Sequence, residues 1–419
     1  MLNADIALAG RLLDALQEAS VDEPGITRDA YGKGEEAAHT IVLKEAERLG
    51  LITTRDAAGN LFMTWPGEHR ERAPWIVGSH LDSVPHGGNF DGAAGVVAGL
   101  AAVSALKAAG LKPPRPIIVL AIRAEESTWF PTSYIGSRAA FGQLEPSALD
   151  LLRADSGRTL AEHMHALGFD AEAVRRGECS IRKGTIHGYV EIHIEQGPTL
   201  ELDNAPIGLV SGISGSFRYR AAKCLGVYGH SGAVPRRHRR DAFMALAELA
   251  MKLDCFWEEN ETPDAPLTIT FGQVTTDPVQ HAFSKVPGEV GFSLDVRSTA
   301  PALLERADTA LMKFAAEIEA RRGVHFDWGP RSGSTPAVMD AGILGLLELI
   351  AGQRGVLAPR LPSGAGHDAA VFSANGIPSA MIFVRNQNGS HNPDEAMRLE
   401  DLEVAATMLA QLLMAEAVK

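Results

Sequence analysis

The sequence predicts an α/β fold in which a mixed, largely parallel sheet carries helices on both faces. Short apolar runs such as residues 75–78 and 116–122 are typical of buried strands, and they alternate with helical segments such as residues 92–109. Polar residues suited to metal binding follow several of these strands. Because ligands of open α/β sheets bind at the carboxyl ends of the strands, we expect these residues to meet at one edge.

The remaining elements of this sheet follow from apolar spacing. Leucine and isoleucine recur at helical intervals over residues 6–16, which predicts an opening amphipathic helix. The alternating segment 189–194 and the apolar segment 380–384 predict further strands. His193 lies near the end of the first strand, and the second strand leads into the loop that carries His391.

The middle third of the chain predicts a separate, inserted unit. Its strand-like and helix-like segments follow the order βαββαβ, which is that of a ferredoxin-like unit. They cover residues 217–228, 240–256, 267–271, 290–296, 301–321 and 324–328. Pro301 at the start and Gly323 past the end are typical of helix boundaries. We therefore predict a catalytic domain of residues 1–212 and 330–419, with residues 213–329 as the insert.

Composition limits the partners and the compartment. A length of 419 residues favours two domains, and a formal charge of -13 argues against a nucleic-acid or anionic-membrane partner. Three cysteines without CxxC spacing favour a reducing compartment. The first residues lack the basic start and apolar core of a signal peptide, and no apolar run reaches the roughly 18 residues of a membrane span. A cytoplasmic enzyme is the expectation.

Five separated segments each offer one ligand for a divalent metal. Together the three imidazoles and two carboxylates suffice for two metal ions if one carboxylate bridges them, and such a pair activates water for hydrolysis. Each residue alone also has an ordinary interpretation, such as a helix N-cap for the aspartate or a core position for a histidine. The five candidates are His80, Asp91, Glu126, His193 and His391.

Two further acids stand beside these ligands. Asp82 follows His80 by two positions, where it can hold the second nitrogen of a metal-bound imidazole. Glu125 and Glu126 are adjacent acids after an apolar strand, which is costly unless positive charge is near. One of this pair can bind metal while the other transfers protons between water and the leaving group.

Several motifs resemble those of the M20 metallopeptidase/amidohydrolase family. The resemblance covers nearly the whole chain and points to the branch of N-carbamoyl-L-amino acid hydrolases, allantoate amidohydrolases and β-ureidopropionases. It implies a di-metal aminopeptidase-like catalytic domain with an inserted lid and dimerisation domain. The motifs are Asp56-Ala-Ala-Gly-Asn-Leu, Gly78-Ser-His-Leu-Asp-Ser-Val-Pro, His193-Ile-Glu-Gln-Gly-Pro, Ser363-Gly-Ala-Gly-His-Asp-Ala and Ser390-His-Asn-Pro.

The resemblance also implies a division of labour among the site residues. His80, Asp91 and His193 would hold one metal ion, and Asp91, Glu126 and His391 the other, with Asp91 bridging. Glu125 would be the general base that takes a proton from a metal-bound water and passes it to the departing nitrogen, and Asp82 would belong with it to the catalytic residues. The ligand types suit two ions of zinc, manganese, cobalt or nickel.

The inserted unit would add substrate contacts within a homodimer. His230 would stabilise the oxyanion, reaching in from the partner subunit, and Arg297 would clamp a substrate carboxylate. Gln196 would lie near the substrate or behind a metal ligand, and His367 with Asp368 would line the same face.

Some positions depart from the branch. Trp129 stands where an arginine is usual, which predicts a bulkier and less positive pocket. Ser284 replaces an asparagine expected to bind substrate, and Ser216 replaces a glutamine. Arg385 and Asn386 stand where proline and serine are common. The metal set and the base are intact, so these departures bear on the substrate rather than on hydrolysis.

The resemblance therefore implies an amidohydrolase that cleaves the linear carbamoyl C–N bond of a small substrate, an N-carbamoyl-L-amino acid. Allantoate, ureidoglycolate or another N-acyl amino acid are alternatives within the class, and Trp129 favours an apolar side chain over allantoate. An M20 dipeptidase and an inactive metal-binding scaffold are the rival interpretations. The second would require loss of the base or of a ligand, and neither is lost.

Overall fold

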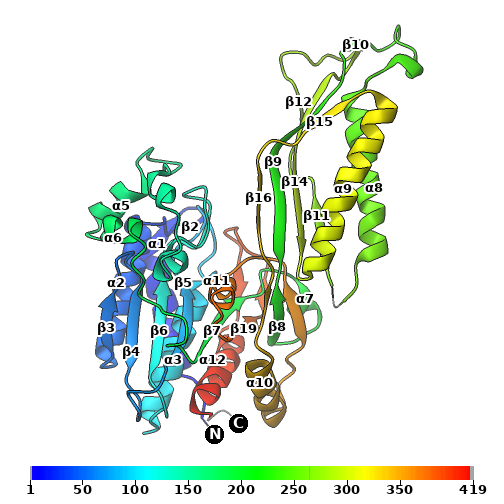
Figure 1. Cartoon of the computed structure of the whole chain (residues 1–419). Helices are drawn as coiled ribbons and strands as arrows, with labels where there is room; N and C mark the ends of the chain where they lie inside the picture. Colours follow the sequence, from blue (N-terminus) through cyan, green and yellow to red (C-terminus); the bar gives the residue numbers. More distant parts are fainter. Residues whose placement is uncertain (1, 264, 416–419) are drawn as a thin grey trace. The chain divides into compact units, whose positions relative to one another are not determined.

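The computed structural model describes residues 2–263 and 265–415 (Figure 1). Within them the chain forms two compact units, here called the first and the second unit. The second unit consists of Gly212–Val338 and Pro362–Gly366, and the other described residues form the first. Residues 212, 330–338 and 362–366 belong to the second unit by their contacts, whereas the predicted boundaries assign them to the catalytic domain.

The first unit is built around a mixed sheet. Its main strands are β3 (Ile52–Arg55), β4 (Leu61–Trp65), β5 (Trp75–His80), β6 (Ile117–Ile122), β7 (Gly188–Ile194), β8 (Ile207–Ile213) and β19 (Ser379–Val384). They lie in the order β8-β19-β7-β5-β6-β4-β3. The four central strands, β19 to β6, run parallel, and the flanking strands are antiparallel. The predicted mixed α/β sheet with a parallel centre is confirmed.

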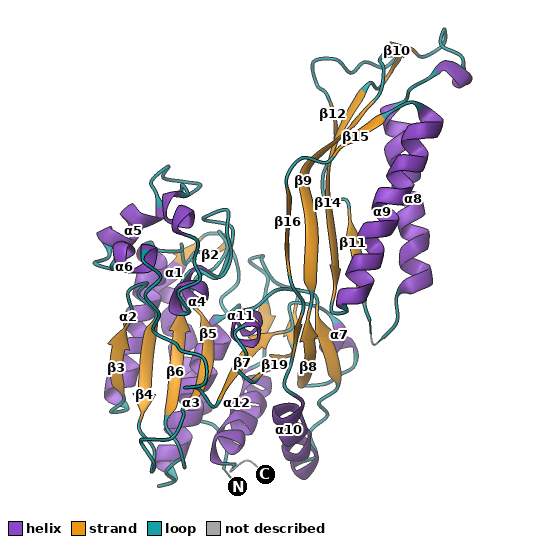
Figure 2. Cartoon of the chain, in the orientation of Figure 1, coloured by secondary structure: helices purple, strands orange, loops and turns teal. Residues whose placement is uncertain are grey.

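Figure 2 shows the strands of the first unit together with its helices, several of which pack on the sheet. They are α1 (Ile6–Ser20), α2 (Lys33–Arg48), α3 (Ala93–Ala108), α4 (Ile135–Ala140), η1 (Pro146–Asp150), α5 (Leu160–Ala166), α6 (Ala171–Arg175), α7 (Thr199–Leu202), α10 (Ala341–Arg354), α11 (Asp368–Ala374) and α12 (Leu399–Met414). The minor strands are β1 (Val21–Asp22), β2 (Gly25–Ile26), β20 (Asn386–Gln387) and β21 (Ala396–Met397), together with β18 (Arg360–Ser363), whose last two residues belong to the second unit.

The central helix α3 shows why the sheet can hold polar residues at its edge. Its sequence is almost wholly apolar and small, and nearly all of it is buried, so it packs closely on β5 and β7. Gly95 is required for this approach, because a Cβ there would lie 2.1 Å from the carbonyl oxygen of Ile192 in β7. The rigid contact fixes the start of α3 against the ends of β5 and β7.

The second unit has a two-layer structure. Its elements are β9 (Gly215–Leu225), β10 (Gly229–His230), η2 (Arg236–His238), α8 (Ala242–Asn260), β11 (Leu267–Thr270), β12 (Val274–Thr276), β13 (Lys285–Val286), β14 (Glu289–Ser298), α9 (Pro301–Arg322), β15 (His325–Asp327), β16 (Arg331–Ser334) and β17 (Ala337–Val338). The antiparallel sheet has the order β11-β14-β9-β15, with β12 pairing β14 and β16 pairing β9.

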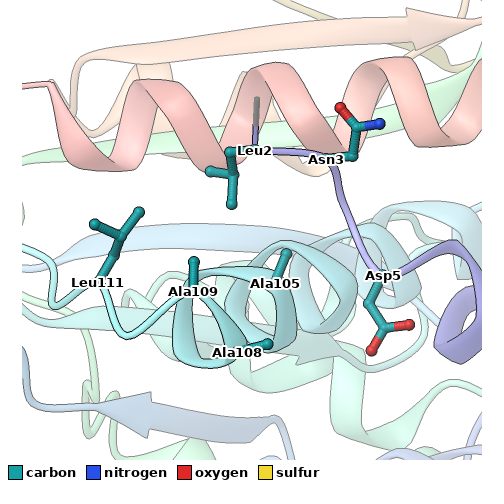
Figure 3. A pocket seen from close by; sticks show the side chains of 7 residues that line it. All are labelled: Leu2, Asn3, Asp5, Ala105, Ala108, Ala109 and Leu111. Atoms are coloured by element: carbon teal, nitrogen blue, oxygen red, sulfur yellow. The ribbon is translucent and has the colours of Figure 1, made fainter.

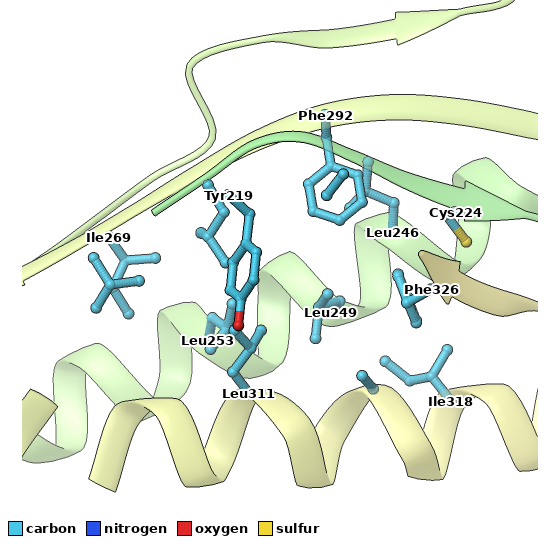
Figure 4. Close-up of a cluster of buried hydrophobic side chains, with 14 of the residues drawn as sticks. Tyr219, Cys224, Leu246, Leu249, Leu253, Ile269, Phe292, Leu311, Ile318 and Phe326 are labelled. Atoms are coloured by element: carbon cyan, nitrogen blue, oxygen red, sulfur yellow. The ribbon is translucent and has the colours of Figure 1, made fainter. Parts of the chain in front are cut away.

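Helices α8 and α9 cover one face of this sheet. Side chains from both layers form a hydrophobic core, in which Tyr219 and Phe292 from the strands face Leu249, Leu311 and Ile318 from the helices (Figure 4). Strand β14 alternates regularly between buried and half-buried residues, as a strand packed on one face should. Helix α9 begins with a proline and ends before Gly323, whose φ of 66° is a left-handed C-terminal cap, as predicted.

Among the described residues, no helix combines the length and apolar character needed to cross a membrane.

Candidate metal centre

The first group of predicted ligands meets where β5 and β7 end and α3 begins. His80 is the last residue of β5, His193 is the next to last of β7, and Asp91 lies two residues before α3. The Oδ1 atom of Asp91 lies 3.1 Å from Nε2 of His193 and 3.5 Å from Nε2 of His80. All three residues are buried.

Both buried histidines are oriented to use the same nitrogen. Nδ1 of His80 lies 3.1 Å from the carbonyl oxygen of Asp82, and Nδ1 of His193 lies 2.9 Å from that of Ile194. Since a carbonyl only accepts, Nδ1 carries a proton in each ring, and Nε2, which faces Asp91, is the nitrogen left for a metal ion. This is the tautomer that a metal ligand requires.

The second group shares Asp91. Its other oxygen, Oδ2, lies 3.3 Å from Nε2 of His391, and the same nitrogen lies 3.1 Å from Oε1 of Glu126. His391 is half exposed and has a left-handed backbone, with φ of 60°. In each group the candidate ligand atoms lie within 4.8 Å of one another. One carboxylate thus faces two separate sets of donors, as a bridging ligand does.

Two local features argue against the alternative interpretation of Asp91 as the N-cap of α3. The side chain of Asp91 makes no capping hydrogen bond, since Gly92 occupies the cap position of α3. A Cβ on Gly92 would lie 2.5 Å from Nε2 of His80, and the φ of Gly92 is 64°. Glycine is therefore needed here for both space and conformation.

The charges of the cluster are consistent with a site for cations. Burial disfavours the ionised carboxylate of Asp91, but His193, His391 and His80 outweigh it and hold its pKa well below the usual range. Hydrogen bonds to Asp91 and Glu126 raise the pKa of His391 to about 11. The acids therefore hold positive charge among the imidazoles, and divalent ions bound by nitrogen and oxygen donors can supply that charge instead. The residues present fit such ions.

Asp82 holds the two adjacent acids as well as His80. Its Oδ1 accepts the backbone N–H of Glu125 at 3.0 Å, and its Oδ2 accepts that of Glu126 at 3.1 Å. Oδ1 also lies 3.4 Å from Nδ1 of His80. Asp82 is fully buried, so it is not the solvated turn aspartate of the alternative interpretation.

Glu125 is buried beside this cluster. Burial is the main cause that raises its pKa well above the usual range, and the nearby acids Glu126, Asp368 and Asp82 act in the same direction against His80. A carboxylate whose pKa is raised in this way is a stronger base toward a nearby water.

Residues of two loops form hydrogen bonds with Asp91. Nε2 of Gln196 donates to its Oδ2 at 2.8 Å, and Oγ of Ser390 lies 2.6 Å from the same oxygen. Glu395 accepts the backbone N–H groups of Phe90 and Asp91 and contacts Ser390. Gln196 therefore contacts a ligand candidate. Glu395 was missed by sequence reasoning, although it follows His391 by only four residues.

Arg385 and Asn386, which follow β19 where proline and serine are common in the branch, each have a structural role. Arg385 forms a two-pronged ion pair with Asp401, at 2.8 and 3.0 Å. Oδ1 of Asn386 accepts the backbone N–H of Gln196 at 3.0 Å, and its Nδ2 donates to the carbonyl of Gly389 at 2.7 Å. Asn386 thus joins the loop of Gln196 to the loop of His391.

The expectation that Trp129 makes the substrate pocket bulkier is wrong. The indole is buried in an apolar cluster, its Nε1 donates to the carbonyl of Ser83 at 2.7 Å, and the guanidinium of Arg153 lies 5.1 Å from its ring centre. Trp129 is therefore part of the packing beneath the Asp82 turn. The preference for an apolar substrate that was inferred from it loses its support.

His367 and Asp368 lie at the start of α11. The ring of His367 meets that of His193 edge-on, with centres 4.5 Å apart, and burial holds its pKa well below the usual range. Asp368 accepts from Oγ of Ser137 at 2.6 Å, and burial followed by Glu191 raises its pKa to about 8.

The other predicted residues belong to the second unit. Nδ1 of His230 accepts the backbone N–H groups of Gly232 and Ala233, each at 3.2 Å, so its proton is on Nε2. The His230 loop is also tied by a 2.9 Å bond from the N–H of Ser231 to the carbonyl of Ser284.

Two more predicted residues, Arg297 and Ser216, lie on the sheet of the second unit. Arg297 donates twice to Oδ2 of Asp295, at 3.1 and 2.8 Å, and once to the carbonyl of Gly364 at 2.9 Å. Oγ of Ser216 lies 3.2 Å from Oγ of Ser334.

A surface hollow elsewhere in the first unit is not a competing site. It has a volume of about 610 Å³ and lies between the N-terminal segment and the end of α3 (Figure 3). Its one carboxylate, Asp5, is occupied by the backbone N–H of Leu8 and by Ser104. The other lining residues are Leu2, Asn3, Ala105, Ala108, Ala109 and Leu111, and none is a metal ligand candidate.

Comparison with known proteins agrees with this geometry. The chain is 34% identical over 400 residues to an N-carbamoyl-L-amino acid amidohydrolase of Geobacillus stearothermophilus, with 95% of each chain covered. It is 30% identical over 390 residues to an allantoate amidohydrolase of Bacillus subtilis strain 168, covering 93% of this chain and 92% of that one. It superimposes on the crystal structure of a hydantoinase/carbamoylase family amidase from Burkholderia multivorans with a TM-score of 0.89 and 27% identity, covering 100% and 99% of the two chains.

The family model for peptidase family M20/M25/M40 matches residues 76–415, a range that contains every candidate metal ligand. The chain belongs to the peptidase family M20/M25/M40.

Proposed function

We propose that the protein is a metal-dependent amidohydrolase that cleaves the carbamoyl C–N bond of an N-carbamoyl-L-amino acid. The products are the amino acid, ammonia and carbon dioxide. The observation that carries this proposal is the position of Asp91, whose two oxygens face two sets of donors beside the buried acid Glu125. The relatives named above act on compounds that contain this bond.

The proposed roles follow from the contacts. His80, Asp91 and His193 hold one divalent ion, and Asp91, Glu126 and His391 hold a second. Bound ions of this kind polarise a carbonyl group and lower the pKa of water. Glu125 takes the proton of the attacking water and delivers it to the departing nitrogen, while Asp82 fixes the backbone of both acids.

The second unit provides the substrate contacts in this proposal and serves as lid and dimerisation domain. Its helix α8 exposes Phe243, Met244 and Met251, which suits a contact between copies. His230 presents the Nε2–H donor that an oxyanion needs, and Arg297 is oriented for a carboxylate by Asp295. Ser284, whose carbonyl binds the His230 loop, and His367 complete the proposed substrate contacts. Free thiols at all three cysteines agree with a cytoplasmic location.

Allantoate is the second candidate substrate. It contains the same carbamoyl group, a relative covering most of this chain bears its name, and Trp129 no longer argues against it.

A substrate screen tests the function. Protein stripped of metal and reloaded with zinc, manganese, cobalt or nickel would be assayed against carbamoyl, formyl and acetyl amino acids, allantoate and dipeptides. We expect ammonia release from carbamoyl amino acids. Release from allantoate alone would favour the second candidate, and cleavage of dipeptides without ammonia would refute the proposal.

Replacing Arg297 by Lys should raise KM for a carboxylate substrate by about tenfold or more, since a two-pronged charged contact is lost. The matched control is the primary amide of the same substrate, whose kcat/KM should change little. Equal losses for acid and amide would contradict the carboxylate clamp.

Mixing His230→Ala protein with Glu125→Gln protein tests whether the site is shared between subunits. If His230 acts across the dimer, half of the dimers carry one intact site, so the mixture should recover up to about a quarter of the wild-type activity. Each variant mixed with itself is the control. A mixture no more active than these controls would place His230 in its own subunit's site or outside catalysis.

A further inference from the structure

The two adjacent acids lie on a turn whose backbone N–H groups are all held by side chains from elsewhere in the first unit. We call residues 123–126 the dyad turn. Each of its four consecutive backbone N–H groups donates to an oxygen of a distant side chain. The pairs are Arg123 to Oδ1 of Asn60 at 3.0 Å, Ala124 to Oε1 of Glu35 at 2.8 Å, Glu125 to Oδ1 of Asp82 at 3.0 Å, and Glu126 to Oδ2 of Asp82 at 3.1 Å.

The dyad turn contains an unfavourable backbone conformation next to the base. Ala124 has a φ of 49°, in the left-handed region that residues with a Cβ other than Asn and Asp rarely adopt. Such a conformation persists only where the surroundings impose it. Its carbonyl accepts the N–H of Ile135 at 3.0 Å, and its own N–H is held by Glu35.

Glu35 holds the N–H of Ala124 from a fixed, buried position. It lies on α2, is fully buried, and uses both carboxylate oxygens. Oε2 accepts the N–H of Tyr31 at 2.7 Å and Nη1 of Arg123 at 3.0 Å, which leaves Oε1 for Ala124. A buried carboxylate is tolerated when it is paired and fully hydrogen-bonded, as here.

We infer that Glu35 is a positioning residue for the hydrolytic reaction. It belongs to neither ligand group and acts through Ala124, whose left-handed backbone aims the carboxyl of Glu125. The inference rests on the proposed function, in which Glu125 is the base. If Glu35 only stabilised the fold, its loss would lower the melting temperature and leave the turnover of folded protein unchanged.

The chain offers a matched control on the same helix. Glu36 also pairs with Arg123, through Nη2, but it is partly exposed and has no bond to the dyad turn backbone. Glu35→Gln and Glu36→Gln each remove one carboxylate from Arg123. Only Glu35→Gln places an amide NH₂ against a backbone N–H group, because one of its two oxygen positions becomes a donor.

The first measurement is kcat and KM of both variants after metal loading. We expect Glu35→Gln to lower kcat by about 10- to 100-fold with KM and metal content unchanged, because small displacements of a catalytic group cost rate rather than binding. Glu36→Gln should stay within about twofold of wild type, because it removes a partner of the Arg123 side chain and leaves every backbone hydrogen bond of the dyad turn in place. Normal kcat in Glu35→Gln, or equal losses in both variants, would overturn the inference.

The second measurement is a rescue. Glycine adopts a φ of 49° without strain, so Ala124→Gly in the Glu35→Gln background should restore a large part of kcat. A purely structural role for Glu35 predicts no recovery, and that result would overturn the inference. If Glu35→Gln does not fold, Glu35→Asp replaces it in both measurements, because its shorter side chain cannot reach Ala124 and Arg123 together.

Wild-type protein and Glu125→Gln in the same assay distinguish a failure of the proposed function from a failure of the inference about Glu35. Wild-type turnover that Glu125→Gln abolishes supports the proposed function, and the Glu35 results then test only the inference. If wild type is inactive on every substrate, the proposed function fails. Amide hydrogen exchange at Ala124 and Glu125 still tests the contact, since protection should fall in Glu35→Gln and not in Glu36→Gln.

Discussion

Replacing Glu125 by Gln is expected to lower kcat by about 10²- to 10⁴-fold, the range that a positioned general base contributes. The amide keeps the size of the side chain but cannot take a proton from water. The backbone N–H of residue 125 can still donate to Asp82, so the dyad turn should keep its shape. Glu125 is not a member of either ligand group, so metal content should not change.

Elemental analysis and steady-state kinetics on the same samples check this result. Glu126→Gln is the informative comparison, because it removes a ligand of the second group and should lose metal together with activity. A Glu125→Gln enzyme within about tenfold of wild type would lie below the range of a general base and would remove Glu125 from that role.

Replacing Asp91 by Asn should remove both ions at once. Both oxygens of Asp91 are engaged, one with each group, and an amide offers one weaker donor oxygen in their place. The substitution preserves side-chain size, so lost packing cannot explain the effect. We expect metal content to fall to near background, with hydrolysis lost in parallel.

Thermal unfolding gives an independent measure of the same loss. A ligand that binds only folded protein stabilises it by about 4 kcal/mol at a thousandfold excess over Kd. Wild-type protein should therefore melt at a clearly lower temperature after chelation, whereas Asp91→Asn should show no such shift. Asp203→Asn, at an exposed position, is the control and should behave as wild type. A chelator shift that survives in Asp91→Asn would contradict a shared ligand.

The parts of this structure that the sequence predicts are those with local, repeated signals. Buried apolar runs locate β5 and β6, and terminal residues locate α9. The metal ligand candidates are predictable for a related reason. Residues that follow parallel strands are brought to one edge by the fold, so His80 and His193 meet although 113 positions separate them.

The supporting residues lack such a signal. Glu35 and Asn60 act as acceptors for backbone N–H groups, and nothing in a sequence states which distant peptide a carboxylate or amide will face. Trp129 shows the opposite error. Glu126, three residues earlier, belongs to the second group of candidate ligands, but the indole of Trp129 points into the hydrophobic packing. Nearness in sequence therefore gave the wrong expectation for Trp129.

The point where the chain leaves for the second unit and returns from it has a practical consequence. Gly212 pairs with Val338 and Ile213 with Ala337. The outgoing and the returning segments of the chain are therefore paired strands of one antiparallel ladder. Opposite residues in such a ladder are about 5 Å apart, a gap that a two-residue hairpin turn closes. The chain could therefore be shortened there to a miniature enzyme core, in which metal loading is studied without the appended module.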